Sequence, residues 1–260
     1  MRKRSKIILA TLVLIAALLA GFVVWAETPL GPMSEANMAL QSDSSVDVRI
    51  GKWLVFSPID SSTSTALIIY PGGRVDSRSY APAAHAIAAR GYLTIIVPMP
   101  LNLALFGINS AASVIESYPE IQSWAIGGHS LGGTMAAQFA YKNPSRIAGL
   151  VLWAAYPASG NDLSKLNVAA ATIHGSNDGL VSQSQIDSSL SLLPADAVRV
   201  EIEGGNHAQF GWYGKQPGDN EATISRELQQ DQIVTATVML LENLESEERF
   251  LGDLQANVRF

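Results

Sequence analysis

The sequence contains no cysteine and only four histidines among its 260 residues. The absence of cysteine excludes disulfide bonds, thiolate metal sites and a cysteine nucleophile. It does not fix the cellular compartment, because a chain without thiols is indifferent to redox conditions. The scarcity of histidine narrows the search for a general base to four side chains, which are His85, His129, His174 and His207.

Charged residues are also scarce, at 15% of the chain, and they are unevenly placed. Four of the 17 basic residues lie in residues 1–6. The rest of the chain carries 13 basic against 23 acidic residues, a formal charge of −10. Such an acidic domain repels phosphate backbones, so we expect no nucleic-acid partner.

An uncharged apolar run, residues 7–26, follows the basic segment 1–6. As a helix these twenty residues extend about 30 Å, which is enough to cross a bilayer core. The basic residues before the run predict a cytoplasmic N-terminus and a main domain on the far side of the membrane. A signal peptide cleaved near Ala26, after Val24-Trp25-Ala26, is the alternative. We favour an uncleaved membrane anchor because the run is longer than a usual signal-peptide core.

The remainder divides into a linker (27–45), one domain (46–245) and a C-terminal tail (246–260) to which we assign no role. Within the linker we expect a short helix around residues 34–40. The first two predicted strands form a hairpin, and apolar strands then alternate with helices, which indicates a mostly parallel sheet covered on both faces. The predicted strands are 46–50, 53–56, 66–70, 92–97, 124–128, 149–155, 168–174 and 198–202, and the helices are 79–90, 108–117, 131–141 and 223–244.

The pentad Gly128-His129-Ser130-Leu131-Gly132 lies between a predicted strand and a predicted helix. A serine at such a turn projects its hydroxyl from the edge of the sheet, and the flanking glycines allow the strand and helix to pack closely. The serine also lies at a helix N-terminus, where free backbone N–H groups stabilise negative charge. Ser130 is therefore the candidate nucleophile.

A serine nucleophile needs a base, and the base needs an orienting acid. Asp178 and His207 both follow predicted strands, as Ser130 does, and the carboxyl ends of parallel strands share one edge of the sheet. His174 would need an acid located elsewhere. His85 falls within a predicted helix, and His129 flanks the serine with its side chain pointing elsewhere. We therefore expect Ser130, Asp178 and His207 to act together.

Two backbone N–H groups are expected to stabilise an oxyanion. The first belongs to Leu131, directly after the serine. The second comes from the turn Pro71-Gly72-Gly73-Arg74, where either Gly73 or Arg74 is the donor. The Arg74 side chain could hold an anionic substrate group or form a salt bridge with Asp76 or with the neighbours of Asp178.

These residues resemble the α/β-hydrolase superfamily over about residues 46–244. The resemblance rests on Tyr70-Pro71-Gly72-Gly73, Gly-His-Ser-Leu-Gly-Gly, His-Gly-Ser-Asn-Asp-Gly and Gly-Gly-Asn-His-Ala-Gln-Phe-Gly, in that order. The chain looks most like compact bacterial members related to dienelactone hydrolases and lysophospholipase-like esterases. It departs from dienelactone hydrolases, which use a cysteine at the position of Ser130. The resemblance implies a serine hydrolase with no metal and no organic cofactor.

Larger members of that family insert a helical cap where this chain has only residues 156–167, so we expect an open cleft without a large cap. Candidate substrate-binding residues at its walls are Met99, Trp153, Tyr156 and Phe210.

The sequence thus favours a serine hydrolase that cleaves a small ester-like molecule through an acyl-enzyme intermediate. An amidase, a peptidase or an acyltransferase would use the same three side chains. From another class, the chain could be a tethered binding protein without catalytic activity.

Overall fold

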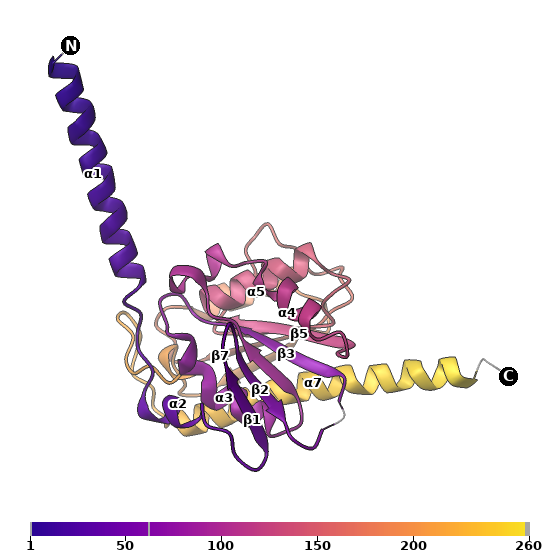
Figure 1. Ribbon diagram of the computed structural model, residues 1–260. Helices are drawn as coiled ribbons and strands as arrows, with labels where there is room; N and C mark the ends of the chain where they lie inside the picture. The colour runs from indigo at the N-terminus through magenta and orange to yellow at the C-terminus, as the bar shows by residue number, and fades with distance from the viewer. Residues whose placement is uncertain (1, 62, 258–260) are drawn as a thin grey trace.

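The computed structural model describes residues 2–61 and 63–257, and one eight-stranded sheet runs through the middle of its main domain (Figure 1). The order of strands across the sheet is β1-β2-β4-β3-β5-β6-β7-β8. The strands are β1 (Val46–Ile50), β2 (Leu54–Pro58), β3 (Thr65–Tyr70), β4 (Leu93–Ile96), β5 (Ser123–His129), β6 (Gly149–Trp153), β7 (Ala169–Gly175) and β8 (Val198–Ile202).

The sheet is mixed but mostly parallel, as the sequence predicted. β1 and β2 form the expected antiparallel hairpin, and β2 pairs antiparallel with β4. From β4 to β8 every neighbouring pair is parallel. The carboxyl ends of these six strands therefore point to one edge, where crossover connections leave the sheet.

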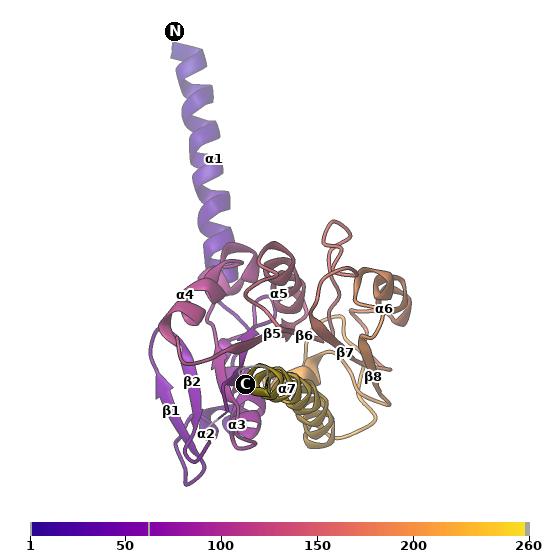
Figure 2. The same ribbon diagram turned by 90° about the vertical axis from the view of Figure 1, so that its right-hand side faces the viewer.

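Helices cover both faces of the sheet (Figure 2). α3 and α7 pack on one face, whereas α4, α5 and α6 pack on the other. The helices of the chain are α1 (Arg2–Ala26), α2 (Ser34–Met38), α3 (Ala81–Ala88), α4 (Ser110–Ser117), α5 (Leu131–Lys142), α6 (Gln183–Ser189) and α7 (Arg226–Asn257). Short 3-10 helices join them, namely η1 (Ser77–Tyr80), η2 (Pro100–Asn102), η3 (Ala104–Phe106), η4 (Leu190–Leu192) and η5 (Ala208–Phe210).

Alternating side chains of the central strands divide the core into two layers. In β3, Leu67 and Ile69 contact the layer under α3 and α7, while Ala66 and Ile68 contact the layer under α4 and α5. All six residues of β3 are buried. This double burial explains why the central strands read as continuous apolar runs in the sequence.

The elements differ from the predictions mainly at their ends. The helix predicted over residues 79–90 begins as η1 and becomes α-helical only at Ala81, since Pro82 is suited to the first turn of a helix. The final helix continues to Asn257, so most of the predicted tail is helical. α6 was not predicted; a capping box formed by Ser182 and Gln185 starts it.

Segment 27–45, which the sequence predicts as a linker, makes contacts with the main domain. Leu30 forms a parallel bridge with Val75, its N–H donates to the carbonyl of Arg74, and its carbonyl accepts from the N–H of Asp76. Ala36 in α2 is fully buried. These contacts attach the segment to the turn that follows β3.

The N-terminal apolar helix α1 projects away from the domain (Figures 1 and 2). Its segment Lys6–Ala26 has a mean hydropathy of 3.0 and packs against nothing over most of its length. By length and composition the helix is able to cross a membrane, and a signal sequence would pass the same test.

Candidate active site

Ser130 lies at a sharp turn between β5 and α5, with a positive φ of 52°. A residue with a side chain adopts such a conformation only when its surroundings enforce it. The surroundings here are close backbone contacts: a Cβ atom on Gly128 would lie 2.4 Å from Tyr70 O, and one on Gly132 would lie 2.2 Å from the same atom. The two glycines of the pentad therefore allow the elbow to rest against the end of β3.

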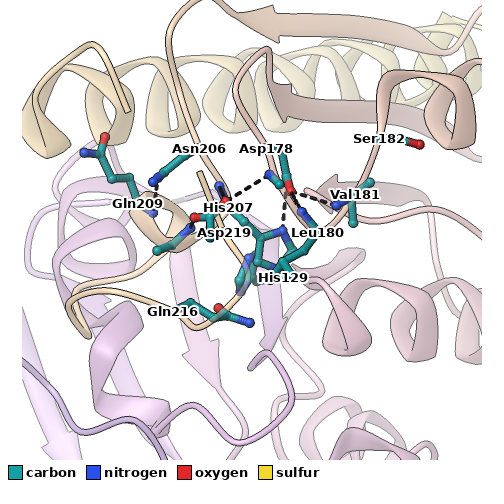
Figure 3. A network of polar contacts seen from close by, with 12 residues as sticks. His129, Asp178, Leu180, Val181, Ser182, Asn206, His207, Gln209, Gln216 and Asp219 are labelled. Carbon is teal, nitrogen blue, oxygen red and sulfur yellow. Dashed lines mark hydrogen bonds and ion pairs between the residues drawn. The ribbon is translucent and has the colours of Figure 1, made fainter. Parts of the chain in front are cut away.

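His207 and Asp178 form a buried pair at the carboxyl ends of β8 and β7 (Figure 3). His207 Nδ1 lies 2.8 Å from Asp178 Oδ2, and both side chains are fully buried. Asp178 Oδ1 accepts hydrogen bonds from the N–H groups of Leu180 at 2.8 Å and Val181 at 2.7 Å. The carboxylate is thus held in place, and it favours the tautomer in which Nδ1 carries the proton and Nε2 has a free lone pair.

Nε2 of His207 is buried and has no hydrogen-bond partner among the described residues. The imidazole packs beside the residue that precedes the serine, with 4.4 Å between the ring centroids of His207 and His129. The hydrogen bond from Ser130 Oγ to Nε2 is not formed in this structure. A free buried acceptor beside the residue that precedes the candidate nucleophile suits a proton acceptor, because catalytic hydrogen bonds often close only when substrate binds.

His129 supports this arrangement and is not itself a suitable base. Its Nδ1 lies 2.9 Å from the hydroxyl of Tyr80, and its ring stacks on Phe210 with 5.6 Å between centroids. Burial and the nearby His207 hold the pKa of His129 well below its usual value. The ring therefore stays neutral and packs against the ring of His207.

The second candidate oxyanion donor is Gly73 and not Arg74. The N–H of Arg74 already donates to Asn102 O at 2.8 Å. The N–H groups of Gly73 and Leu131 have no acceptor within the described part of the chain. The two residues are in contact, since a Cβ atom on Gly73 would be 3.2 Å from Leu131 Cδ2. Two unpaired donors beside Ser130 form the kind of pocket that binds an oxyanion.

The side chain of Arg74 contacts the end of α1 and the residues after it, and it does not pair with Asp76. Its guanidinium donates to Trp25 O at 2.9 Å and to Thr28 O at 2.7 Å, and it stacks over the Trp25 ring. Asp76 instead pairs with Arg78 at 2.6 Å. The expected salt bridge with Asp76 was wrong, because the segment that follows α1 packs here, which the sequence did not reveal.

Two of the four predicted pocket walls do not fit the structure. Trp153 is fully buried and its indole N–H donates to Thr237 in α7, so it belongs to the core below the sheet. Phe210 is also fully buried, behind His129. Met99 is nearly buried, and Tyr156 is half-buried with its hydroxyl accepting from Gln185. For Met99 and Tyr156 a role in substrate binding stays a prediction.

Asp219 is a polar anchor of the site that sequence reasoning missed (Figure 3). Its carboxylate accepts hydrogen bonds from the N–H groups of His207, Ala208 and Gly179, at 3.3, 2.8 and 3.0 Å. It therefore ties the loop that carries His207 to the loop that carries Asp178. Asp219 lies in a loop with no strand before it, so no pattern distinguished it from a solvated surface residue.

Within residues 2–61 and 63–257, no group of three or more histidine and acidic side chains is arranged to hold a metal ion.

A strained serine at a strand–helix elbow, followed along the chain by an aspartate and a histidine from later strand ends, is the constellation of an α/β hydrolase. The chain belongs to the alpha/beta hydrolase family, whose sequence model matches residues 66–231. No curated protein matches the chain in sequence.

Solved structures with the same fold include bacterial esterases at low identity. Esterase 2 of Thermogutta terrifontis is 13% identical with a TM-score of 0.57, over 77% of this chain and 93% of that one. Est1E of Butyrivibrio proteoclasticus is 12% identical with a TM-score of 0.53, over 76% and 100%. A predicted CIB-like hydrolase of Thermoplasma acidophilum is 18% identical with a TM-score of 0.54, over 76% and 99%. At these identities the likeness concerns the fold.

Proposed function

We propose that this protein is a serine hydrolase that cleaves carboxylic esters through an acyl-enzyme intermediate, with Ser130, His207 and Asp178 as its catalytic triad. The observation that carries the proposal is the buried His207–Asp178 hydrogen bond, which leaves Nε2 unpaired beside the serine elbow. This geometry prepares the imidazole to take a proton from an alcohol.

In the acylation step, Ser130 Oγ attacks the ester carbonyl and His207 Nε2 takes the hydroxyl proton. The tetrahedral oxyanion lies against the N–H groups of Leu131 and Gly73, and Asp178 stabilises the imidazolium. Collapse of the intermediate breaks the bond to the alkoxy group, which leaves as an alcohol with the proton from Nε2. Water then attacks the acyl-enzyme by the same route in reverse and releases the carboxylic acid.

The relatives in structure support ester cleavage over the alternatives. Esterase 2 of T. terrifontis has been solved with propionate and with butyrate bound, and another neighbour is an arylesterase. An amidase, a peptidase or an acyltransferase would use the same triad. Turnover of p-nitrophenyl esters of several chain lengths, compared with peptide substrates and with non-water acceptors, separates these activities.

Labelling with a fluorophosphonate probe tests the catalytic role of Ser130 in the full-length protein. We expect the wild-type protein to be labelled and Ser130→Ala to remain unlabelled, with p-nitrophenyl ester turnover falling at least about 10⁴-fold in the variant. A wild-type protein that is not labelled, or equal labelling of both proteins, would show a non-catalytic binding protein. Ser176→Ala, at the end of another strand, is the control and should keep its labelling.

We further propose that α1 stays attached as a membrane anchor and places the domain on the far side of the cytoplasmic membrane. Ala26 is fully buried, and its carbonyl accepts from Asn102 Nδ2 at 3.0 Å. Cleavage after Ala26 would cut through the contacts that fix this segment to the domain. N-terminal sequencing of the native protein tests the proposal, and a chain that starts at Glu27 would contradict it.

A further inference from the structure

The last turn of α1 is bound directly to the edge of the sheet that carries the active site. Arg74, in the turn after β3, binds the carbonyls of Trp25 and Thr28, and Asn102, in the segment after β4, binds the carbonyl of Ala26. Carbonyls at a helix C-terminus lack partners within the helix, so these side chains satisfy them. The apolar span therefore ends where the catalytic edge begins, with no spacer between them.

The two turns that bind the end of α1 have strained backbone conformations and are hydrogen-bonded to each other. Arg74, Leu101 and Asn102 all have positive φ, at 55°, 55° and 53°. The N–H of Arg74 donates to Asn102 O, so the two turns that hold α1 also hold each other. Residues other than glycine keep such conformations only where the surrounding structure enforces them. Gly73, the proposed oxyanion donor, directly precedes Arg74, so α1 and the oxyanion pocket share one rigid turn.

An exposed apolar segment lies beside α1 at this junction. Leu105 and Phe106 in η3 are 54% and 52% exposed, and the Phe106 ring lies 6.4 Å from the ring of Phe22 in α1. Phe22 is four residues before Ala26, which corresponds to about 6 Å along the helix. Side chains of interfacial segments reach about 5–10 Å into a bilayer surface, so Phe106 lies at that depth when α1 spans the membrane.

The composition of the segment fits a lipid environment. Residues 91–115 contain no charged side chain, and this stretch includes both η2 and η3. Trp25 and Phe22 lie in the last turns of α1, where aromatic side chains typically mark the boundary between membrane and water. The segment also approaches the catalytic machinery, because a Cβ atom on Gly73 would lie 3.7 Å from Leu103 Cδ2.

We propose that the active site opens onto the surface of the membrane that α1 spans, with Leu105 and Phe106 immersed in it, and that its substrate is an acyl ester residing in that bilayer. The inference rests on the proposed ester hydrolysis and adds the location and class of the substrate. The occupant of the apolar segment is a lipid surface, because the segment continues the face of α1 and lies at the depth where α1 leaves the hydrocarbon.

The test uses the full-length protein reconstituted in vesicles of a diether phosphatidylcholine, which contains no ester to cleave. Two substrates are compared: p-nitrophenyl oleate dissolved in the vesicles and p-nitrophenyl butyrate in the buffer. The variant carries Leu105→Ser and Phe106→Ser. The control carries Ile59→Ser and Val198→Ser, which alter two side chains of similar exposure, 50% and 57%, at the opposite edge of the sheet.

We expect the first variant to lose about tenfold of its oleate turnover while its butyrate turnover stays unchanged, because two apolar side chains no longer hold the cleft in the lipid. The control should keep both activities. Equal oleate turnover in the variant and the wild type would overturn the inference while leaving the proposed function intact. Failure of the wild type to cleave butyrate would instead contradict the proposed function.

A second copy of the chain is the other occupant that the experiment examines. Analytical ultracentrifugation of both proteins in detergent measures their oligomeric state. A wild-type dimer that the Leu105→Ser, Phe106→Ser variant converts to a monomer would overturn the lipid assignment, whereas one unchanged state in both proteins supports it.

Discussion

At the scale of single residues, the polar groups around His207 decide how well it is positioned. Asp178 orients the imidazole ring through its hydrogen bond with Nδ1, while Asp219 holds the backbone of His207 and Ala208 by accepting from their N–H groups. The two carboxylates have different tasks although they lie in neighbouring loops. Asp178 contacts His207, the proposed base, and Asp219 joins the loops that carry His207 and Asp178. Asp219 is therefore a positioning residue.

Asp219→Ala should lower kcat for p-nitrophenyl butyrate about 10- to 100-fold, since a small displacement of a catalytic group is costly. KM should change little, because the Asp219 carboxylate accepts from the N–H groups of Gly179, His207 and Ala208 and not from those of the proposed oxyanion donors. Asp219→Asn, which keeps one acceptor oxygen, should recover part of the loss. Asp196→Ala removes an exposed carboxylate as the matched control. A kcat within twofold of wild type for Asp219→Ala would contradict this role, and circular dichroism checks that the variant is folded.

At the scale of elements, the contact of the β5–α5 elbow with the end of β3 forms the site. It brings the donor at Leu131 to the donor at Gly73, and it depends on a glycine at position 132. A Cβ atom there would lie 2.2 Å from Tyr70 O and 2.3 Å from Pro71 O, both of which are backbone atoms.

Gly132→Ala should therefore destabilise the protein by about 2–4 kcal/mol or displace the elbow, because backbone cannot yield as a flexible side chain would. Urea unfolding and fluorophosphonate labelling measure the two outcomes. Gly160→Ala is the control, since a Cβ atom on Gly160 would meet nothing within 4 Å. Unchanged stability together with unchanged labelling in Gly132→Ala would show that the contact is looser than described.

Much of the sheet and the pairing of His207 with Asp178 could be predicted from the sequence. Buried parallel strands are continuous apolar runs, and functional side chains gather where such strands end. The position of Trp153 at a strand end gave a wrong prediction of a pocket wall. A strand end places a residue near the edge of the sheet, but it does not say which face of the sheet the side chain is on. Trp153 lies two residues after Val151 in β6, so both side chains are on the same face of the strand and pack in the core layer under α7.

The attachments of the N-terminal segment and of Asp219 could not be predicted. Leu30 pairs with Val75, and Arg74 binds the end of α1, across distances in the sequence that no local pattern spans. The sequence also could not predict which N–H group of the Gly73-Arg74 turn stays unpaired, because this depends on the hydrogen bond from Arg74 N–H to Asn102 O. Tertiary contacts of this kind are set by packing and leave no periodic signal.

At the scale of the whole molecule, buried histidines make stability depend on pH. Burial lowers the pKa of His129 and of His174. The nearby imidazole of His207 lowers the pKa of His129 further, and the nearby guanidinium of Arg199 lowers that of His174 further. The unfolded chain binds a proton at each of these positions near the usual histidine pKa of about 6.5. Their contribution to stability is therefore fully present above about pH 6.5 and is lost as the pH falls toward the lower folded pKa values.

The free energy of unfolding should accordingly decrease below about pH 6.5, by up to about 1.4 kcal/mol per pH unit for each such histidine. Urea unfolding of the detergent-solubilised protein at several values between about pH 5 and pH 7 measures the slope. His174→Gln, which removes the buried imidazole whose Nε2 lies 3.6 Å from a Glu201 carboxylate oxygen, should show a shallower slope. A slope equal to that of wild type would contradict the assignment.

The junction between α1 and the turns of Arg74 and Asn102 has a kinetic consequence. If α1 spans the membrane as proposed, every copy would hold Ser130 at one height above the bilayer, because no spacer separates α1 from the domain. The proposed enzyme would then meet its ester by lateral diffusion in two dimensions. The rate would then follow the mole fraction of ester among the lipids and not its amount per volume of buffer. Diluting the membrane with inert lipid would slow turnover, whereas diluting the vesicle suspension with buffer would leave the rate per enzyme unchanged.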